Sequence, residues 1–123
     1  MKLNKPKHSL LKNGMYAVEG FMDITKNETS FKWQLLMFFV MGIISWSLPI
    51  SFGYSSMLFL SLFIPLLAEV ANSSIERVVD LVTKEYHVLA KQAKDAGATL
   101  VLLSLVLTIG IWVTVLLQAF GLV

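Results

Sequence analysis

A carboxylate lies at the edge of the longest apolar stretch of the sequence. No charged residue occurs from Trp33 to Ala68, and Glu69 then opens a more polar run that ends at Asp80. A carboxylate about one turn inside an apolar helix costs up to about 2.5–3.5 kcal/mol near the centre of a membrane, and less near its edge. A residue kept at such a cost is a candidate for function, so Glu69 is the first candidate for a functional residue.

Three further polar side chains share the helical face of Glu69. Asn72, Glu76 and Asp80 follow it at positions +3, +7 and +11. A helix with about 3.6 residues per turn brings these spacings to one face. One wall of this helix is therefore expected to carry three carboxylates and an amide, from the membrane edge into the cytosol.

More polar residues are expected at the same membrane edge, namely Glu28, Glu85, His87, Lys94 and Asp95. Oxygen ligands, few histidines and no cysteine favour a hard cation, Mg²⁺ above Zn²⁺. Mg²⁺ held by one or two carboxylates usually completes its shell with nucleotide phosphates, and a lysine nearby offers a cation for a phosphate. The sequence has no glycine-rich phosphate loop of a common soluble type.

These features together predict a metal–phosphate site at a membrane surface, with a deeper carboxylate facing the lipid. Phosphoryl transfer to a lipid hydroxyl fits such a site, because this reaction mainly requires positioning and charge neutralisation. The alternative is a solvated extension of the helix, in which Asp80 pairs with Lys84 at i,i+4.

The composition indicates an integral membrane protein that forms one domain, residues 1–123. Of its 123 residues, 56% are hydrophobic, and the mean hydropathy is +0.72. The charge-free segments and the turn signals around Pro49 and Gly53 divide into three spans, about 31–48, 52–72 and 97–120. The expected fold class is therefore all-α, with three transmembrane helices and an N-terminal surface helix.

The surface helix is expected at about 8–26. Leu11, Met15, Val18 and Met22 repeat at intervals of 4, 3 and 4 residues and form an apolar stripe. This pattern is typical of an amphipathic helix that lies in the membrane interface. The alternative is a soluble helix that packs this stripe on the cytosolic ends of the spans.

The second and third spans carry residues that can shape or join them. Pro65 removes a backbone hydrogen bond to the carbonyl of Ser61 and can kink its helix one turn before Glu69. Ser104, Thr108 and Trp112 recur at i,i+4 and are interpreted as helix-packing contacts. The helix of the second span is expected to continue into the cytosol to about Glu85, within a cytosolic connection of about 73–96 that turns back over 85–97.

All ten basic residues lie on one side of the expected spans. They are Lys2, Lys5, Lys7, Lys12, Lys26 and Lys32 toward the N-terminus, and Arg77, Lys84, Lys91 and Lys94 between the second and third spans. The positive-inside rule then places the N-terminus and the 73–96 connection in the cytoplasm and the C-terminus outside. The basic pI of about 9.0 indicates contact with anionic lipid rather than nucleic acid.

The run from Glu69 to Asp80 also resembles the E-x-x-N-[ST]-[AS]-[IL]-E-x-[VL]-[VC]-D signature of the prokaryotic diacylglycerol kinase family. The resemblance covers about residues 9–118 and includes the length, the span count and the charge placement. Other matching positions are Asn27-Glu28, Glu85-Tyr86-His87, Ala93-Lys94-Asp95, Gly97 and Trp112.

The resemblance implies an integral kinase of the bacterial inner membrane that phosphorylates the hydroxyl of diacylglycerol with MgATP and yields phosphatidic acid. It also implies a homotrimer whose active sites are shared between neighbouring subunits. Carried over by position, Glu69 is the general base, and Glu28 and Glu76 bind the metal. Asn72 positions the reacting groups, and Asp95 supports the site. The nucleotide-binding set implied is Lys12, Tyr16, Glu85, Tyr86, His87 and Lys94.

Four positions depart from the family pattern: Ser9, Ala17, Gln34 and Lys91 stand where arginine, a small hydroxyl residue, glutamate and glycine are common. Two alternatives to a diacylglycerol kinase stay open. Undecaprenol kinase belongs to the same family and uses a polyprenol acceptor. A small non-enzymatic membrane protein could use Glu69 for proton coupling, although a proton carrier needs no second acid at Glu76.

Overall fold

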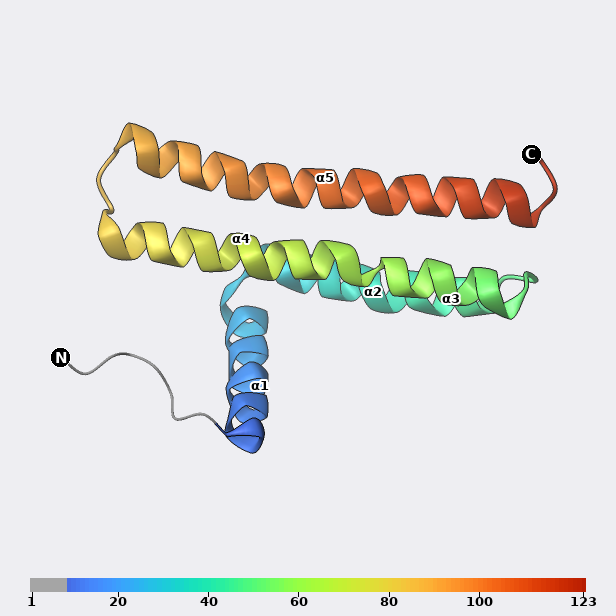
Figure 1. Cartoon of the computed structure of the whole chain (residues 1–123), viewed down its shortest axis with the longest axis horizontal. Helices are drawn as coiled ribbons and strands as arrows, with labels where there is room; N and C mark the ends of the chain where they lie inside the picture. The colour runs from blue at the N-terminus through green and yellow to red at the C-terminus, as the bar shows by residue number, and fades with distance from the viewer. Residues whose placement is uncertain (1–8) are drawn as a thin grey trace.

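The computed structural model describes residues 9–123 as α-helices joined by short connections, with no strand in that range (Figure 1). The expected all-α class is confirmed. The helices are α1 (Leu10–Asn27), α2 (Thr29–Ser47), α3 (Phe52–Ser61), α4 (Phe63–Val82) and α5 (Val88–Ala119).

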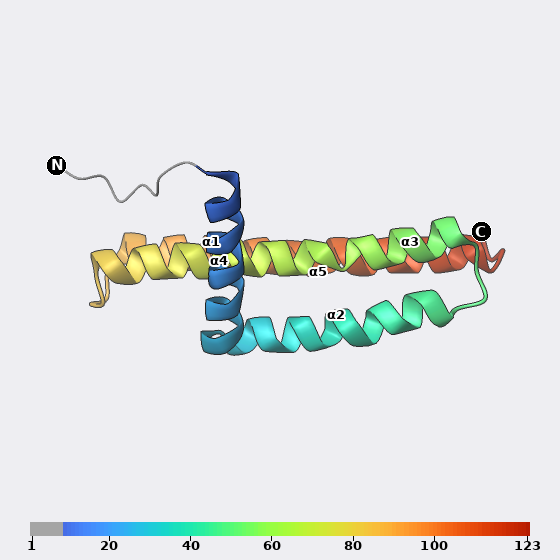
Figure 2. The same cartoon turned by 90° about the horizontal axis from the view of Figure 1, so that it is seen from below.

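The helices form a long antiparallel assembly with one crosswise element. α3 and α4 follow each other along nearly one axis, and α5 returns beside them. α2 packs on α3 and α4 along a different side, while α1 lies across the assembly (Figure 2). The connection from α4 to α5 therefore lies at one end of the molecule, and the α2–α3 connection and the C-terminus lie at the other (Figure 1).

Within residues 9–123, two helical segments are long and apolar enough to cross a membrane, Phe52–Val82 and Val88–Ala119. α2 coincides with the expected span 31–48, but it has 19 residues and carries Lys32 and Gln34 in its first turns. The expectation of three spans therefore stays a prediction.

The segment Phe52–Val82 is interrupted at Leu62, one turn before Pro65, as the proline predicts. Pro65 has no N–H for the carbonyl of Ser61, and Thr108 Oγ1 of α5 lies 3.4 Å from that oxygen. The single hydroxyl proton of Thr108 has a closer acceptor in the carbonyl of Ser104, at 2.9 Å, so Thr108 serves one of the two carbonyls at a time. Trp112 Nε1 also donates to Ser61 Oγ at 3.2 Å, so the expected packing role of these α5 residues is confirmed.

The connection between α4 and α5 is much shorter than expected. The predicted turn over 85–97 is wrong beyond residue 87, because α4 continues to Val82 and α5 already begins at Val88. His87 Nδ1 accepts a hydrogen bond from the N–H of Leu89 at 3.2 Å and caps α5. The residues that follow this cap are mostly leucine, alanine, lysine and glutamine, which favour helix. Residues 73–82 and 88–96 thus extend the two helices beyond the apolar segments.

α1 begins two residues later than the predicted surface helix and ends at Asn27; His8 lies outside the described residues. Its apolar stripe of Leu11, Met15, Val18 and Met22 is exposed, so the packing of that stripe on the spans of the same chain is not observed. α1 instead joins α2 through buried Ile24 and an edge-to-face contact of Phe21 with Phe31, whose ring centroids are 5.6 Å apart.

Candidate active site

Glu69 is buried in α4 and is held by an amide from α2. Its exposed fraction is 5%, and Gln34 Nε2 donates to its Oε2 at 3.0 Å. The two residues lie where the apolar parts of α2 and α4 give way to their polar ends. The deep carboxylate that the sequence predicts is therefore present, with a hydrogen-bond donor that fixes one of its oxygens.

Asn72 occupies the contact between α4 and α5. Its Nδ2 donates to Glu76 Oε1 at 3.0 Å, which links two of the residues predicted to share a face. Its Oδ1 is buried and has no hydrogen-bond partner within residues 9–123. A Cβ atom at Gly97 of α5 would lie 2.2 Å from this oxygen, so only glycine allows α5 to approach so closely.

The acidic residues of this region differ in whether a cation neutralises them. Glu69 and Glu76 take part in none of the ion pairs formed within residues 9–123. Glu28, by contrast, pairs with Arg77 Nη2 at 3.1 Å, and Arg77 also binds Asp23. The hydrogen bond from Arg77 holds the pKa of Asp23 below its ordinary value of 3.8. Arg77 thus ties α1 and the start of α2 to α4.

The predicted metal ligands of one chain form only part of a metal-binding site. Within residues 9–123, no three His, Asp or Glu side chains form a cluster that could hold a metal ion. Glu76 lacks a cationic partner, and the unpartnered Asn72 Oδ1 lies on the preceding turn. Mg²⁺ usually binds proteins through one or two carboxylates and takes its other ligands from water and phosphates, so this oxygen-only set fits it.

A second group of predicted residues surrounds a polar pocket at the α4–α5 connection. The pocket has a volume of about 400 Å³, and the site residues that line it are Asp80, Glu85, Tyr86, His87, Lys94 and Asp95. Lys94 Nζ of α5 binds Asp80 Oδ1 of α4 at 2.6 Å, so Asp80 does not pair with Lys84. Asp95 pairs with Lys91 on the exposed surface of α5.

The remaining nucleotide-binding candidates lie elsewhere. Lys12 and Tyr16 are exposed on α1, and neither lines the pocket at the α4–α5 connection. A single chain therefore brings Glu85, Tyr86 and His87 together with Lys94 but leaves the α1 residues apart from them.

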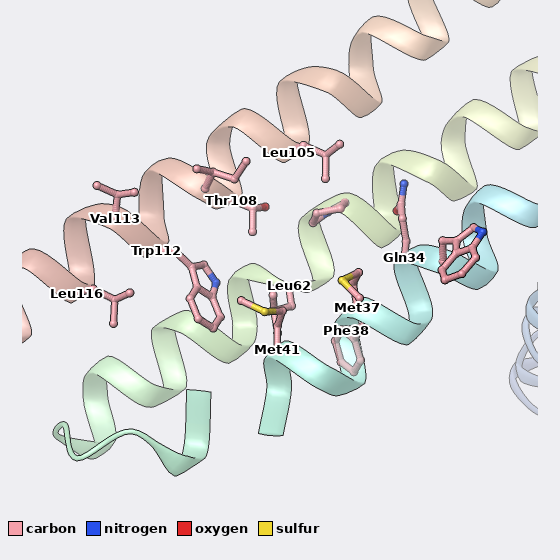
Figure 3. Close-up of a pocket in the computed structure, with 13 residues that line it drawn as sticks. Gln34, Met37, Phe38, Met41, Leu62, Leu105, Thr108, Trp112, Val113 and Leu116 are labelled. Atoms are coloured by element: carbon pink, nitrogen blue, oxygen red, sulfur yellow. The ribbon is translucent and has the colours of Figure 1, made fainter. Parts of the chain in front are cut away.

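An apolar groove of about 450 Å³ runs between α2, α4 and α5 (Figure 3). Apart from Gln34 and Thr108, its lining is apolar and includes Met37, Phe38, Met41, Leu62, Leu105 and Trp112. Gln34 and Leu116 lie toward opposite ends of the labelled residues in Figure 3. Through Gln34, the groove is connected to the carboxylate of Glu69.

Two residues of this region did not emerge as site residues from the sequence. Gln34 appears there only as a departure from the family pattern, and Arg77 only as one of the cytosolic basic residues. Gln34 has a signal that points to it, since it is the one carboxamide between Trp33 and Ala68. The contacts of Arg77 with Asp23 and Glu28 join residues far apart in the sequence, and no local pattern predicts them.

The arrangement has the chemical parts that a transfer reaction at a membrane surface requires. A buried, oriented carboxylate can accept a proton from a hydroxyl. The carboxylate of Glu76, which has no cationic partner within residues 9–123, can bind a metal. Lys94 lines the polar pocket at the α4–α5 connection, where its ammonium group can bind a phosphate.

The sequence of the chain is similar to those of known proteins. A sequence profile described as Prokaryotic diacylglycerol kinase matches residues 15–116. A diacylglycerol kinase of Pseudomonas aeruginosa is 31% identical over 102 residues, which cover 83% of each chain. A diacylglycerol kinase of Escherichia coli K12 is 29% identical over 112 residues, covering 91% of this chain and 92% of the relative. One from Helicobacter pylori J99 is 30% identical over 111 residues, covering 90% and 87%. This chain therefore belongs to the prokaryotic diacylglycerol kinase family.

Proposed function

We propose that the chain is a lipid kinase that transfers the γ-phosphate of ATP to the hydroxyl of diacylglycerol and yields phosphatidic acid at the cytosolic face of the membrane. The observation that carries this proposal is the buried carboxylate of Glu69. It lies at the edge of the apolar helices, has no cationic partner in residues 9–123, and is oriented by Gln34. The family membership supplies the reaction class.

In the proposed reaction, Glu69 takes the proton of the lipid hydroxyl as that oxygen attacks the γ-phosphate. Asn72 keeps Glu76 in place through its 3.0 Å hydrogen bond. Lys94 neutralises phosphate charge, and Asp95 supports the site. Glu28 and Glu76 would hold Mg²⁺, which when bound offsets the negative charge of the ATP phosphates.

The nucleotide is proposed to occupy the pocket at the α4–α5 connection, where Glu85, Tyr86 and His87 meet Lys94. Lys12 and Tyr16 do not line this pocket in one chain, which supports their supply from the α1 helix of a neighbouring subunit. A homotrimer with shared active sites provides such a neighbour. In such an assembly Glu28 from a neighbour could also complete the metal site.

The proposed membrane arrangement has three spans, formed by α2, by α3 with α4, and by α5, in the bacterial inner membrane. The N-terminus and the α4–α5 connection are cytoplasmic, and the C-terminus is outside. The exposed apolar stripe of α1 supports its placement in the membrane interface, because such a stripe is favourable only against lipid or another protein.

Transfer of radiolabelled phosphate from ATP tests the function and its acceptor together. The purified protein in lipid vesicles with Mg²⁺ receives diacylglycerol or undecaprenol in separate reactions. Labelled phosphatidic acid is the expected product. Label in undecaprenyl phosphate alone would assign the enzyme to the other acceptor, and no labelled lipid from either would contradict the kinase proposal.

A further inference from the structure

Gln34 makes a contact that its place in the sequence does not require. It lies in the first turns of α2, and its side chain reaches across to α4, where Nε2 donates to Glu69 Oε2 at 3.0 Å. Within residues 9–123 this is the single hydrogen bond to the Glu69 side chain. The orientation of the carboxylate in this chain therefore depends on one amide.

The chemistry of the pair fixes which way the amide faces. An ionised carboxylate has only acceptors, so Gln34 must present its nitrogen to Glu69. Glu69 then has one oxygen occupied by Gln34 and the other, Oε1, without a donor from residues 9–123. A general base needs such an oxygen within hydrogen-bond reach of the hydroxyl whose proton it takes.

The same orientation leaves the other end of the amide unsatisfied. Gln34 Oε1 is buried and accepts no hydrogen bond within residues 9–123. A buried acceptor without a donor lowers stability, whereas an apolar side chain of similar shape avoids that loss. A leucine at position 34 would suit the apolar groove that Gln34 lines (Figure 3). The apolar groove therefore does not explain the amide, whereas its hydrogen bond to the buried Glu69 carboxylate does.

We propose that Gln34 is a positioning residue of this enzyme, which holds Glu69 Oε2 so that Glu69 Oε1 faces the hydroxyl of the lipid acceptor. This inference rests on the proposed function, in which Glu69 is the general base. Gln34 acts through Glu69 and does not itself exchange a proton.

Substitution of Gln34 by leucine separates positioning from packing. Gln34→Leu removes the donor and the unsatisfied acceptor together, and Gln118→Leu makes the same change at an exposed position of α5. We expect kcat of Gln34→Leu to fall by about ten- to hundredfold, the usual result of a misplaced reacting group. The KM for ATP is expected to stay within about twofold, because the polar pocket at the α4–α5 connection does not include Gln34. The thermal unfolding temperature is expected to change little, because the variant removes the unsatisfied Gln34 Oε1 but leaves the buried Glu69 Oε2 without a donor.

The pH dependence of kcat gives a readout that packing alone does not move. The amide of Gln34 donates to the carboxylate of Glu69 and so favours its ionised form. Loss of this donor disfavours the ionised carboxylate. The acid limb of the kcat profile should therefore move to higher pH in Gln34→Leu and stay in place in Gln118→Leu.

The outcomes distinguish this inference from the proposed function. If the wild-type protein labels a lipid and Gln34→Leu retains its kcat and its acid limb, the positioning role is overturned while the kinase stands. A fall in activity that matches a fall in unfolding temperature, with an unmoved acid limb, also overturns it in favour of a structural role. A wild-type protein that labels neither lipid removes the proposed function and this inference with it.

Discussion

The acidic residues of the site are distinguished by their partners more than by their positions. Glu69 is buried and bound to Gln34, Glu76 is bound to Asn72, and Glu28 is neutralised by Arg77. A carboxylate that lacks a cation retains its charge for a metal or a proton. Glu76 is therefore the carboxylate of a single chain that is most available to Mg²⁺.

Substitution of Glu76 by glutamine should raise the Mg²⁺ concentration required for half-maximal activity. Glutamine retains an oxygen that can accept the hydrogen bond of Asn72, so the change removes charge and little else. We expect an increase of at least about tenfold, since loss of a group that merely supports a metal ligand typically costs about 10–100-fold in affinity. Mg²⁺ titration of the initial rate measures it, with Glu19→Gln on the exposed face of α1 as the control. Equal midpoints in Glu76→Gln and wild type would place the metal elsewhere.

For single residues, the sequence predicts contacts between side chains of the same helix but not contacts between side chains of different helices. The spacing of Asn72 and Glu76 predicts a shared face, and the 3.0 Å hydrogen bond between them follows from it. The partners of Glu69, Glu28 and Asp80 come from other helices and depend on how these pack. Arg77 therefore emerges from the structure alone, and the sequence points to Gln34 only as the one carboxamide between Trp33 and Ala68.

Among the elements, the pair formed by α4 and α5 places most of the site. The two helices approach closely at Gly97, where a Cβ atom would lie 2.2 Å from Asn72 Oδ1. Farther toward the connection, Lys94 binds Asp80 across the same pair. The apolar half is joined by Thr108 and Trp112, which contact the carbonyl and the hydroxyl of Ser61. A change at Gly97 should therefore disturb both the packing and the position of Asn72.

Gly97→Ala should lower both stability and activity, while Gly110→Ala in the same helix should not. The added methyl group at position 97 must displace Asn72 or α5, and such overpacking typically costs about 1–3 kcal/mol. No atom lies within 4 Å of a Cβ at Gly110, where alanine should be neutral or stabilising by up to about 1 kcal/mol. Denaturation in detergent and the specific activity measure the two effects. Similar behaviour of the two variants would mean that the close approach at Gly97 has no role in the site.

The elements themselves were largely predictable, with one exception that has a physical reason. Charge-free runs, the turn at Pro49 and the break before Pro65 all predict features that the structure contains. The connection after α4 was predicted to be longer, because the charges of 88–96 resemble a polar loop. Their helix propensity and the cap at His87 outweigh that polarity, and α5 begins at Val88.

For the whole molecule, the distribution of charge predicts a single orientation in the membrane. Single cysteines at Ser9, Gln92, Gly53 and Val123 report on it, and the native chain has no cysteine that would add background. We expect the first two to react only from the cytoplasm and the last two only from outside, because all ten basic residues lie toward the first pair. Labelling of Gln92 from outside in intact cells would invert the arrangement and separate Lys94 from cytosolic ATP.

The assembly of subunits is the feature least predictable from the sequence and the fold of one chain. The pocket at the α4–α5 connection collects Glu85, Tyr86 and His87, yet Lys12 and Tyr16 remain apart on α1. Contacts between chains depend on which surfaces meet, and no sequence pattern within one chain identifies those surfaces. The proposed trimer accordingly rests on the family resemblance and on this separation.

The most direct test of the proposed lipid kinase compares phosphoryl transfer by the wild-type protein and by Glu69→Gln, with Glu19→Gln as the control. Glutamine preserves the size of the side chain and removes its basicity. We predict that kcat for phosphatidic acid formation falls by about 10²–10⁴-fold in Glu69→Gln, the range typical of a lost general base. The control and the oligomeric size of both variants should match the wild type. A Glu69→Gln protein that forms phosphatidic acid with a near-normal kcat would contradict the assignment of Glu69 at the centre of the site.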